Sequence, residues 1–385
     1  MSPSEQLEQL LDADPDELVA RVRSAIEPIL RSHDHSFILF GTGELGRIAL
    51  RNLRRLGKPP VAFADNNPAQ QGATVEGVPV MAPEEAQAKF PRSLFVVTVY
   101  TNSPVHAQLD AMGAVHITFA QLAWCYSDAF LPRCALELPH KIFENADKVR
   151  EAAKVWADDS SRAEYVAQIA WRCTLYPAAL PAHAPASETY FPADLFQLGQ
   201  SDVLVDCGAF DGDTARAFLA RSKQPFQRFI GLEPDPKNRE RFTRWHAGLA
   251  SNLQERIELL PFASGESRGR VSFSNDGEVT STVGTGPLEV DVAPLDELVG
   301  HYSPTFVKMD IEGAEPGALR GTREILGRDQ PILAVCLYHA QEHLWEIPLL
   351  IQSLNPRYQL FLRRHSDECW ELVCYAIPAE RTEGL

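Results

Sequence analysis

Several kinds of pattern are missing from this 385-residue chain, and each absence excludes a class of protein. No run of about 18 apolar residues occurs, so the sequence predicts no membrane-spanning helix. The seven cysteines are scattered and form no CxxC pair, which argues for reduced thiols and against a disulfide framework or a zinc site. The first residues are acidic and lack the basic-then-apolar order of a signal peptide. These absences predict a cytoplasmic location.

An excess of positive charge is also missing. The chain has 36 Lys and Arg against 52 Asp and Glu, and its formal net charge is −16. Proteins that bind nucleic acid or anionic membranes rely on basic surfaces, so we expect neither among the partners of this chain. A small-molecule substrate is expected instead. A homo-oligomer is compatible with the sequence, which does not determine the oligomeric state.

The remaining composition is that of an ordinary globular protein, with 45% hydrophobic and 23% charged residues. A chain of this length typically forms two domains. We expect an N-terminal domain over 1–125 with leading helices, a helical connector and proline-rich linker over 126–187, and a C-terminal domain over 188–385. Strand and helix patterns alternate in both halves, which predicts the α/β class with two Rossmann-like domains built on parallel sheets.

The strands expected from apolar runs fall into two sets. Those of the first half follow one or two helices over 5–32 and are placed at 37–40, 61–64, 94–99 and 115–118. Those of the second half are placed at 203–206, 228–232, 257–262, 271–273, 288–292, 305–310, 331–337, 358–363 and 371–377. The last two are joined by a polar turn at 365–368, which predicts an antiparallel hairpin at the end of the second sheet.

A glycine-rich turn follows the first strand of the N-terminal domain. Gly41, Gly43 and Gly46 form a GxGxxG pattern with a strand before it and an amphipathic helix after it, and Asp65 ends the next strand. This context is typical of a nucleotide-binding turn. The alternative is a tight Rossmann-like turn that binds nothing, because a fold alone does not establish a function.

A second glycine-rich turn begins the C-terminal domain with VDCGAFDGDT at 205–214. Asp206 ends the strand, and Gly208 and Gly212 let the backbone approach a ligand at the start of the next helix. Glu233 ends the second strand, where an acid is placed to bind ribose hydroxyls. The second half is therefore expected to bind a nucleoside joined to a carboxylate.

The second half resembles the FkbM family of S-adenosylmethionine-dependent methyltransferases, within the class I methyltransferase fold. The matching motifs lie between about residues 188 and 378 and are VDCGAFDGDT, GLEPDPKN, PLDEL, KMDIEGAEPGALRG, YH, WEIP and the terminal ELVCYAIP. The first half is similar to small Rossmann-like domains that precede sugar-modifying catalytic domains, through ADNNPAQQGATVEGVPV at 64–80.

The resemblance implies S-adenosylmethionine as cofactor and gives roles to residues by position. Asp206, Gly208 and Gly212 would hold the methionine portion, Glu233 would accept the ribose hydroxyls, and Ser264 would lie beside the adenine.

The catalytic candidates follow two strands of the second sheet. Asp310 and Glu312 come after the strand near 305–309, and His339 comes after the strand at 331–337. His339 is the first choice for general base because the usual pKa of histidine lies near neutrality. The alternatives are a histidine that only hydrogen-bonds to its neighbours, and a divalent metal held by Asp310 and His339.

These patterns together predict an O-methyltransferase that acts on a sugar hydroxyl or a glycosylated small molecule. The N-terminal domain would bind a nucleotide-sugar, or help to position the acceptor, through Gly41, Gly43, Gly46 and Asp65. Two other functions are weighed against this one. The first is a nicotinamide-dependent oxidoreductase, and the second is a non-catalytic nucleotide-sugar-binding module.

Overall fold

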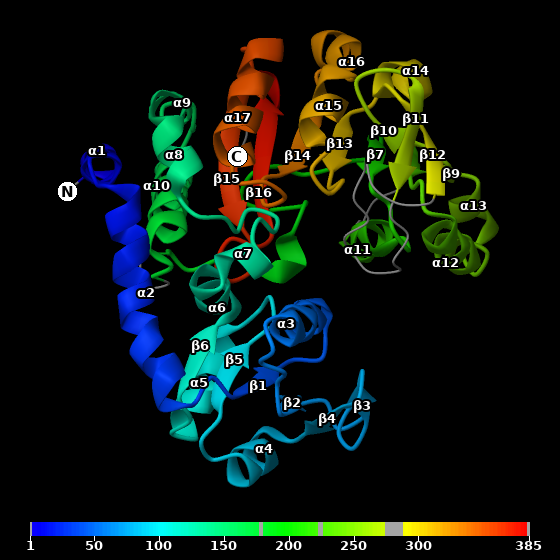
Figure 1. Cartoon of the computed structure of the whole chain (residues 1–385). Helices are drawn as coiled ribbons and strands as arrows, with labels where there is room; N and C mark the ends of the chain where they lie inside the picture. The colour runs from blue at the N-terminus through cyan, green and yellow to red at the C-terminus, as the bar shows by residue number, and fades with distance from the viewer. Residues whose placement is uncertain (1, 177–179, 222–225, 274–287, 383–385) are drawn as a thin grey trace. The chain divides into compact units, whose positions relative to one another are not determined.

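The computed structural model describes residues 2–176, 180–221, 226–273 and 288–382, and Figure 1 traces the chain. Its contacts divide the chain into two compact units. Unit 1 comprises 1–146, 166–182 and 366–370, and unit 2 comprises 147–165, 183–365 and 371–385. The domain boundaries expected at residues 125 and 187 stay predictions.

The sheet of unit 1 has six strands in the order β3-β4-β2-β1-β5-β6. The strands are β1 (Phe37–Phe40), β2 (Ala62–Ala64), β3 (Thr74–Val75), β4 (Val78–Met81), β5 (Leu94–Val97) and β6 (His116–Thr118). All neighbouring strands are parallel except β3, which pairs with β4 in antiparallel register. Strands β3 and β4 were not among those expected from the sequence, because β3 has only two residues and Pro79 interrupts the apolar run of β4.

The helices up to Thr174 are labelled in Figure 1, and the part of them between residues 147 and 165 belongs to unit 2. They are α1 (Pro3–Leu11), α2 (Pro15–Ser32), α3 (Glu44–Arg55), α4 (Pro83–Lys89), α5 (Ser103–Ala111), α6 (Phe119–Cys125), α7 (Ser127–Phe130), α8 (His140–Glu144), α9 (Ala146–Ala152) and α10 (Asp159–Thr174). Asp14 caps the start of helix α2, because its side chain accepts hydrogen bonds from the backbone amides of Asp16 and Glu17. Helix α2 packs against α6. The two leading helices expected over 5–32 are α1 and α2.

The main sheet of unit 2 has seven strands in the order β15-β16-β14-β13-β7-β8-β9. The strands are β7 (Val203–Cys207), β8 (Arg228–Leu232), β9 (Ile257–Leu260), β13 (Phe306–Met309), β14 (Ile332–Cys336), β15 (Tyr358–Arg364) and β16 (Leu372–Pro378). Strand β16 runs antiparallel to β14 and β15, so the predicted terminal hairpin is confirmed. The predicted α/β class with a class I methyltransferase type of sheet is confirmed as well.

A smaller sheet in unit 2 consists of β10 (Ala263–Ser264), β11 (Gly269–Phe273) and β12 (Leu288–Ala293). The helices of this unit are α11 (Asp213–Arg221), α12 (Pro236–His246), α13 (Ser251–Gln254), α14 (Leu295–Leu298), α15 (Glu315–Arg320), α16 (Arg323–Arg328), α17 (His343–Leu354) and α18 (Ala379–Thr382). Helix α17 packs against α15 and α16 (Figure 1).

Burial explains why these strands form a sheet. Every residue of β7, β13 and β14 is buried, as expected for central parallel strands with both faces covered.

The segment expected as a proline-rich linker carries a short 3₁₀ helix, Ala186–Glu188, and its Pro177 lies outside the described residues. All seven cysteines are free. Among the described residues, no helix is both long and apolar enough to cross a membrane.

Candidate active site

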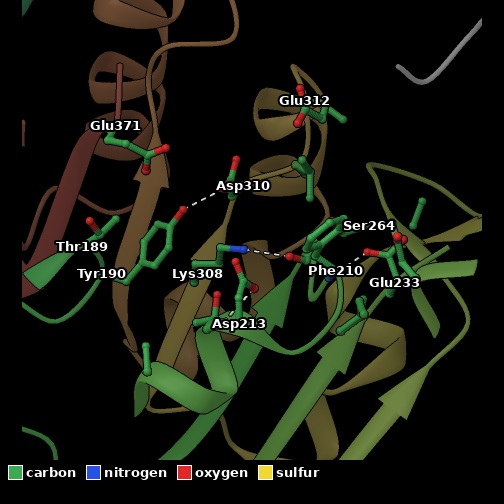
Figure 2. Close-up of a pocket in the computed structure, with 18 of the residues that line it drawn as sticks. Thr189, Tyr190, Phe210, Asp213, Glu233, Ser264, Lys308, Asp310, Glu312 and Glu371 are labelled. Atoms are coloured by element: carbon green, nitrogen blue, oxygen red, sulfur yellow. Dashed lines mark hydrogen bonds between the residues drawn. The ribbon is translucent and has the colours of Figure 1, made fainter. Parts of the chain in front are cut away.

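A cavity of about 550 Å³ lies in unit 2 beyond the carboxyl ends of β7, β8 and β13 (Figure 2). Strand β7 lies between β8 and β13. The connection after β7 leads to β8 on one side, and the connection after β13 leads to β14 on the other side. Such a switch point leaves a crevice, and ligands of open α/β sheets bind there. Four residues expected in the site from the sequence line this cavity together with Gly208, namely Glu233, Ser264, Asp310 and Glu312.

Gly208 is required by close packing against the neighbouring strand. Its φ is +82°, and a Cβ at this position would lie 2.0 Å from the backbone oxygen of Asp310. The glycine therefore brings the loop after β7 against the loop after β13. Gly212 plays a different part, because its Cβ would meet the Trp245 ring at 2.8 Å. It packs against α12 and is not one of the cavity residues.

One end of the cavity is shaped by Glu233 and Ser264. The two carboxylate oxygens of Glu233 accept hydrogen bonds from the backbone amides of Asp235 at 2.8 Å and Phe210 at 2.9 Å. Burial raises the pKa of Glu233 to about 7, although these amides act in the opposite direction. The Asn238 side chain also donates to this carboxylate, and of its about four acceptor sites one remains for a ligand hydroxyl.

Ser264 adds an incompletely used polar group at the same end. Its Oγ is buried and makes no hydrogen bond of ordinary geometry with the described residues. The thiol of Cys207 interacts with it, but a thiol is a weak hydrogen-bonding partner. Phe262 and Ala263 line the cavity beside it. An acid, a free hydroxyl and an apolar wall fit a nucleoside.

A buried ion pair lies beneath the centre of the cavity. Lys308 Nζ is 2.9 Å from Asp206 Oδ1 and donates to the Gly208 backbone oxygen at 2.8 Å. Burial alone would lower the pKa of Lys308, but the charges of Asp206 and Asp310 raise it above its usual value. Asp206 is not among the cavity residues. It instead holds the lysine that braces the glycine loop.

The opposite end of the cavity is organised around Asp310. Its carboxylate accepts from the Tyr190 hydroxyl at 2.7 Å and from the Tyr338 hydroxyl at 3.2 Å, and His339 Nε2 lies 3.2 Å away. Burial would raise the pKa of Asp310, but Lys308 and His339 lower it below its usual value. Asp310 is therefore an ionised carboxylate that is already well supplied with donors.

His339 lies behind Asp310 and does not belong to the cavity lining. Its Nδ1 is 2.7 Å from Glu315 Oε1, and its side chain is only 2% exposed. Burial alone would lower the pKa of His339, but Glu315 and Asp310 raise it well above the usual value. A histidine between two carboxylates is held as the cation, which has no free lone pair to take a proton. The His339 ring thus orients Asp310.

The same cluster bears on the predicted metal site. Among the described residues, Asp310, Glu315 and His339 offer ligand atoms that lie within 4.8 Å of one another. Glu315 and His339 already bind each other directly, and His343 Nδ1 lies 3.5 Å from the second Glu315 oxygen. His343 is the first residue of α17 and lies beside this cluster through Glu315. A divalent metal at Asp310 and His339 stays a prediction.

Tyr190 and Glu371 are among the cavity residues that were not expected from the sequence. Tyr190 comes from the proline-rich segment, and Glu371 immediately precedes β16. The only available signal for Glu371 was its place as the first letter of the ELVCYAIP motif. Both residues have positive φ, 68° for Tyr190 and 49° for Glu371, and so do the cavity residues Phe210 and Glu312. Such backbone strain in non-glycine residues gathers at functional sites.

In unit 1, the glycine turn is closed by the chain's own groups. Gly41 has a φ of +108°, and a Cβ on Gly46 would lie 2.1 Å from the Gly41 backbone oxygen. Asp65 accepts from the amide of Thr42 at 3.1 Å and from its hydroxyl at 2.7 Å. Around Gly43, in contrast, no described atom lies within 4 Å of where a Cβ would be. A ligand for Gly41, Gly43, Gly46 and Asp65 stays a prediction.

Comparison with protein families gives one match. Residues 206–366 match the family model described as the methyltransferase FkbM domain. This match runs from the end of β7 through β15 and includes most of the cavity residues, although Tyr190 and Glu371 lie outside it. It confirms the resemblance seen in the sequence. No curated protein matches the chain significantly.

Comparison with solved structures supports the fold of the whole chain. The crystal structure of a methyltransferase FkbM from Methylobacillus flagellatus KT is 23% identical, with a TM-score of 0.71, and the match covers 94% of this chain and all of that one. Two partial similarities have TM-scores too low for any argument. The match to a UDP-D-quinovosamine 4-dehydrogenase from Vibrio fischeri covers 22% of this chain and 75% of that one, with 24% identity and a TM-score of 0.19. The match to Aeropyrum pernix fibrillarin with bound S-adenosyl-L-methionine covers 50% of this chain and 76% of that one, with 12% identity and a TM-score of 0.32.

Proposed function

We propose that this chain, which carries a methyltransferase FkbM domain at residues 206–366, transfers a methyl group from S-adenosylmethionine to a hydroxyl group of a sugar or a glycosylated small molecule. The observation that carries the proposal is the cavity, because it joins a nucleoside-type end at Glu233 to an acidic end at Asp310 (Figure 2). A donor bound at the first end would present its reactive part toward the second.

The residues present fit this cofactor. Glu233 accepts from two backbone amides and the Asn238 side chain and keeps acceptor capacity for a ribose hydroxyl, and the buried Ser264 hydroxyl lacks a strong partner. Gly208 lines the cavity where the methionine portion is expected, and Lys308 holds its backbone oxygen. When bound, S-adenosylmethionine supplies an activated methyl group on a sulfonium. The protein's part is to hold that group in line with the acceptor oxygen, which alone contributes a large share of the acceleration.

The acidic end would orient the acceptor. The Asp310 carboxylate is fixed by Tyr190, Tyr338 and His339, so its direction toward the cavity is set before a ligand enters. A fixed carboxylate can accept a hydrogen bond from an acceptor hydroxyl without reorganising. His339 and Glu315 support Asp310 from behind and act through it. Asp310 is thus a substrate-binding residue in this proposal, and His339 is a positioning residue.

The charge of this end narrows the class of acceptor. Asp310, Glu312 and Glu371 line it, and the one cation of the described lining, Lys308, is buried and paired with Asp206. A phosphate or carboxylate on the acceptor would be repelled at close range in such surroundings. We therefore expect the part of the acceptor that enters the cavity to be an uncharged sugar or one that carries an amine.

Calorimetry and a transfer assay test the proposal together. Full-length protein is titrated with S-adenosylhomocysteine, and a tritiated methyl donor is then incubated with a small-molecule extract of the source organism. We expect binding to one site and label in small molecules. Glu233→Gln should weaken binding, whereas Glu240→Gln should not, because Glu240 is an exposed residue of α12 that pairs with Arg244. Absence of binding by the wild-type protein would refute the cofactor assignment.

A further inference from the structure

Glu371 is a cavity residue to which the proposed function gives no role in the reaction. This residue lines the acidic end of the cavity and follows the turn that connects β15 to β16. Figure 2 shows its carboxylate directed toward the part of the cavity where Asp310 and Tyr190 lie. Its backbone carbonyl accepts from the amide of His365 at 3.0 Å, which holds the residue in place at the end of the hairpin.

The Glu371 carboxylate has a feature that the other carboxylates of the site lack. Within the part of the chain that the structure describes, it makes no hydrogen bond and no ion pair. Glu233 accepts from two backbone amides, and Asp310 accepts from two tyrosines beside a histidine. A partly buried carboxylate without donors is costly, and such groups in native proteins call for an explanation.

The backbone of Glu371 makes the cost larger. Its φ of +49° lies in the left-handed region, where a residue with a side chain is strained. Glycine or asparagine would fit this conformation with less strain. Glu371 thus combines a strained backbone with a carboxylate that has no donor, and this residue lines the cavity.

We propose that Glu371 is the catalytic base that removes the proton from the acceptor hydroxyl as its oxygen takes the methyl group. This inference rests on the proposed function. In the step, a bond forms between the acceptor oxygen and the methyl carbon, and the carbon–sulfur bond breaks with its electron pair passing to sulfur. The proton of the hydroxyl passes to Glu371 and then to solvent. No other reactant is required.

The charges around Glu371 suit this role. Burial raises its pKa to about 7, and the negative charge of Asp310 adds to the rise, while His339 and Lys308 act in the opposite direction and Asp213 in the same one. A base works best when its pKa lies near the working pH, since it then takes protons readily and is still ionised in part. Asp310, whose pKa is lowered, is a weaker base, and the His339 ring is already protonated.

Roles are thereby divided within the acidic end. Asp310 receives three donors and orients the hydroxyl, whereas Glu371 receives none and takes the proton. This division gives the Asp310 and Glu371 carboxylates separate roles at the same end of the cavity.

The matched control for Glu371 is Glu368. It also has a positive φ, of 55°, and burial raises its pKa to about 7 as well. It lies three residues away in the chain and is not among the cavity residues. A Glu→Gln change at either position removes a carboxylate whose pKa is raised by burial. The two positions differ in access to the cavity and in the hydrogen bonds that the Asn102 and Trp370 side chains make to Glu368.

The first test needs no acceptor. Infrared titration of the full-length protein follows the carboxyl C=O band between pH 5 and pH 9, with Glu371→Gln and Glu368→Gln subtracted in turn. We expect the Glu371 difference band to titrate near pH 7 and to shift when S-adenosylhomocysteine is added. Titration of this band below about pH 5, the ordinary range of glutamate, would overturn the inference.

The second test follows methyl transfer from tritiated donor to the small-molecule extract as a function of pH. Wild-type activity should rise with pH through about 7, and Glu371→Gln should lose this rise together with about 10²–10⁴-fold in turnover. S-adenosylhomocysteine affinity should stay near wild type, and Glu368→Gln should keep both turnover and pH profile. Turnover within about threefold of wild type in Glu371→Gln would overturn the role of this residue. Loss of S-adenosylhomocysteine binding by the wild type would instead refute the underlying function.

Discussion

His339 Nδ1 lies 2.7 Å from Glu315 Oε1, and both side chains are almost completely buried. The Asp310 carboxylate lies against the other nitrogen of the same ring. The histidine therefore joins a fully enclosed acid to one that faces the cavity. This relationship makes the ring part of the support of the site, and it leads to the first prediction.

His339→Ala should destabilise the protein by about 3–5 kcal/mol, because the enclosed Glu315 loses its partner. Chemical denaturation at pH 7 measures the change. His339→Gln, which can still donate to Glu315, should cost less. An effect of His339→Ala below about 1 kcal/mol would contradict the strong pairing.

The contribution of the His339–Glu315 pair to stability depends on pH because the pKa values of both groups are shifted. The pKa of His339 is raised, so its stabilising effect is complete below its usual value near 6.5 and is lost as pH rises through the folded value. The pKa of Glu315 is lowered, chiefly because the charge of His339 outweighs the effect of burial, so its contribution is present above about 4.5 and is lost as pH falls. The difference between wild type and His339→Gln should therefore be largest between about pH 4.5 and 6.5 and should decrease at alkaline pH.

Glu371→Gln should make the protein more stable at alkaline pH. The raised pKa of Glu371 means that the folded state favours the protonated acid, and wild type loses this contribution as pH rises from 4.5 through about 7. The variant keeps a neutral side chain throughout. Thermal or urea unfolding at pH 8.5 should show a gain of up to about 3 kcal/mol, with little difference at pH 4.5. Equal stability at both pH values would show that the carboxylate is not strained by its surroundings.

Glu233→Gln should weaken S-adenosylhomocysteine binding by roughly ten- to hundredfold. The variant keeps the shape of the side chain but loses one charged acceptor, and hydrogen bonds to charged groups contribute about 1.5–3 kcal/mol. Calorimetry at pH 8, where most of the Glu233 carboxyl is ionised, measures the change. Wild-type affinity in this variant would mean that the ribose hydroxyls bind elsewhere.

Gly46→Ala and Gly43→Ala should separate packing from ligand binding in unit 1. The first places a methyl group 2.1 Å from the Gly41 backbone oxygen and should cost about 1–3 kcal/mol or more. The second meets open space with an ordinary φ of −70° and should cost less than about 1 kcal/mol. Differential scanning fluorimetry compares the two. Weaker binding of a nucleotide-sugar to a stable Gly43→Ala protein would place that ligand at the turn, and equal stability of both variants would contradict the packing.

Labelled products from the transfer assay should be neutral or cationic. Ion-exchange separation of the extract before incubation gives anionic, neutral and cationic fractions. The acidic end of the cavity should confine the label to the last two. Label mainly in phosphorylated or carboxylated products would show that the acceptor does not enter beside Asp310, Glu312 and Glu371.

Much of the fold follows from local patterns. The buried runs at β1, β7 and β14 were predicted from apolar residues alone, since a central parallel strand has both faces covered and leaves an unbroken signal. Strands β3 and β10 were missed because two residues carry too little pattern, and β4 was missed because Pro79 interrupts its apolar run. Position at a strand end was also enough to predict Glu233 and Asp310 as site residues.

What the sequence by itself determined is thus the class of fold, the resemblance of the second half to the FkbM family, and the acids that follow β8 and β13, because these depend on residues close together in the chain. Only the tertiary structure decided which of the candidates share one cavity. Asp206 is paired beneath the cavity with Lys308, His339 is enclosed by Glu315, and Glu371 reaches the site from the far end of the hairpin. These roles depend on burial and on partners more than 20 residues away along the chain, and a local pattern contains neither.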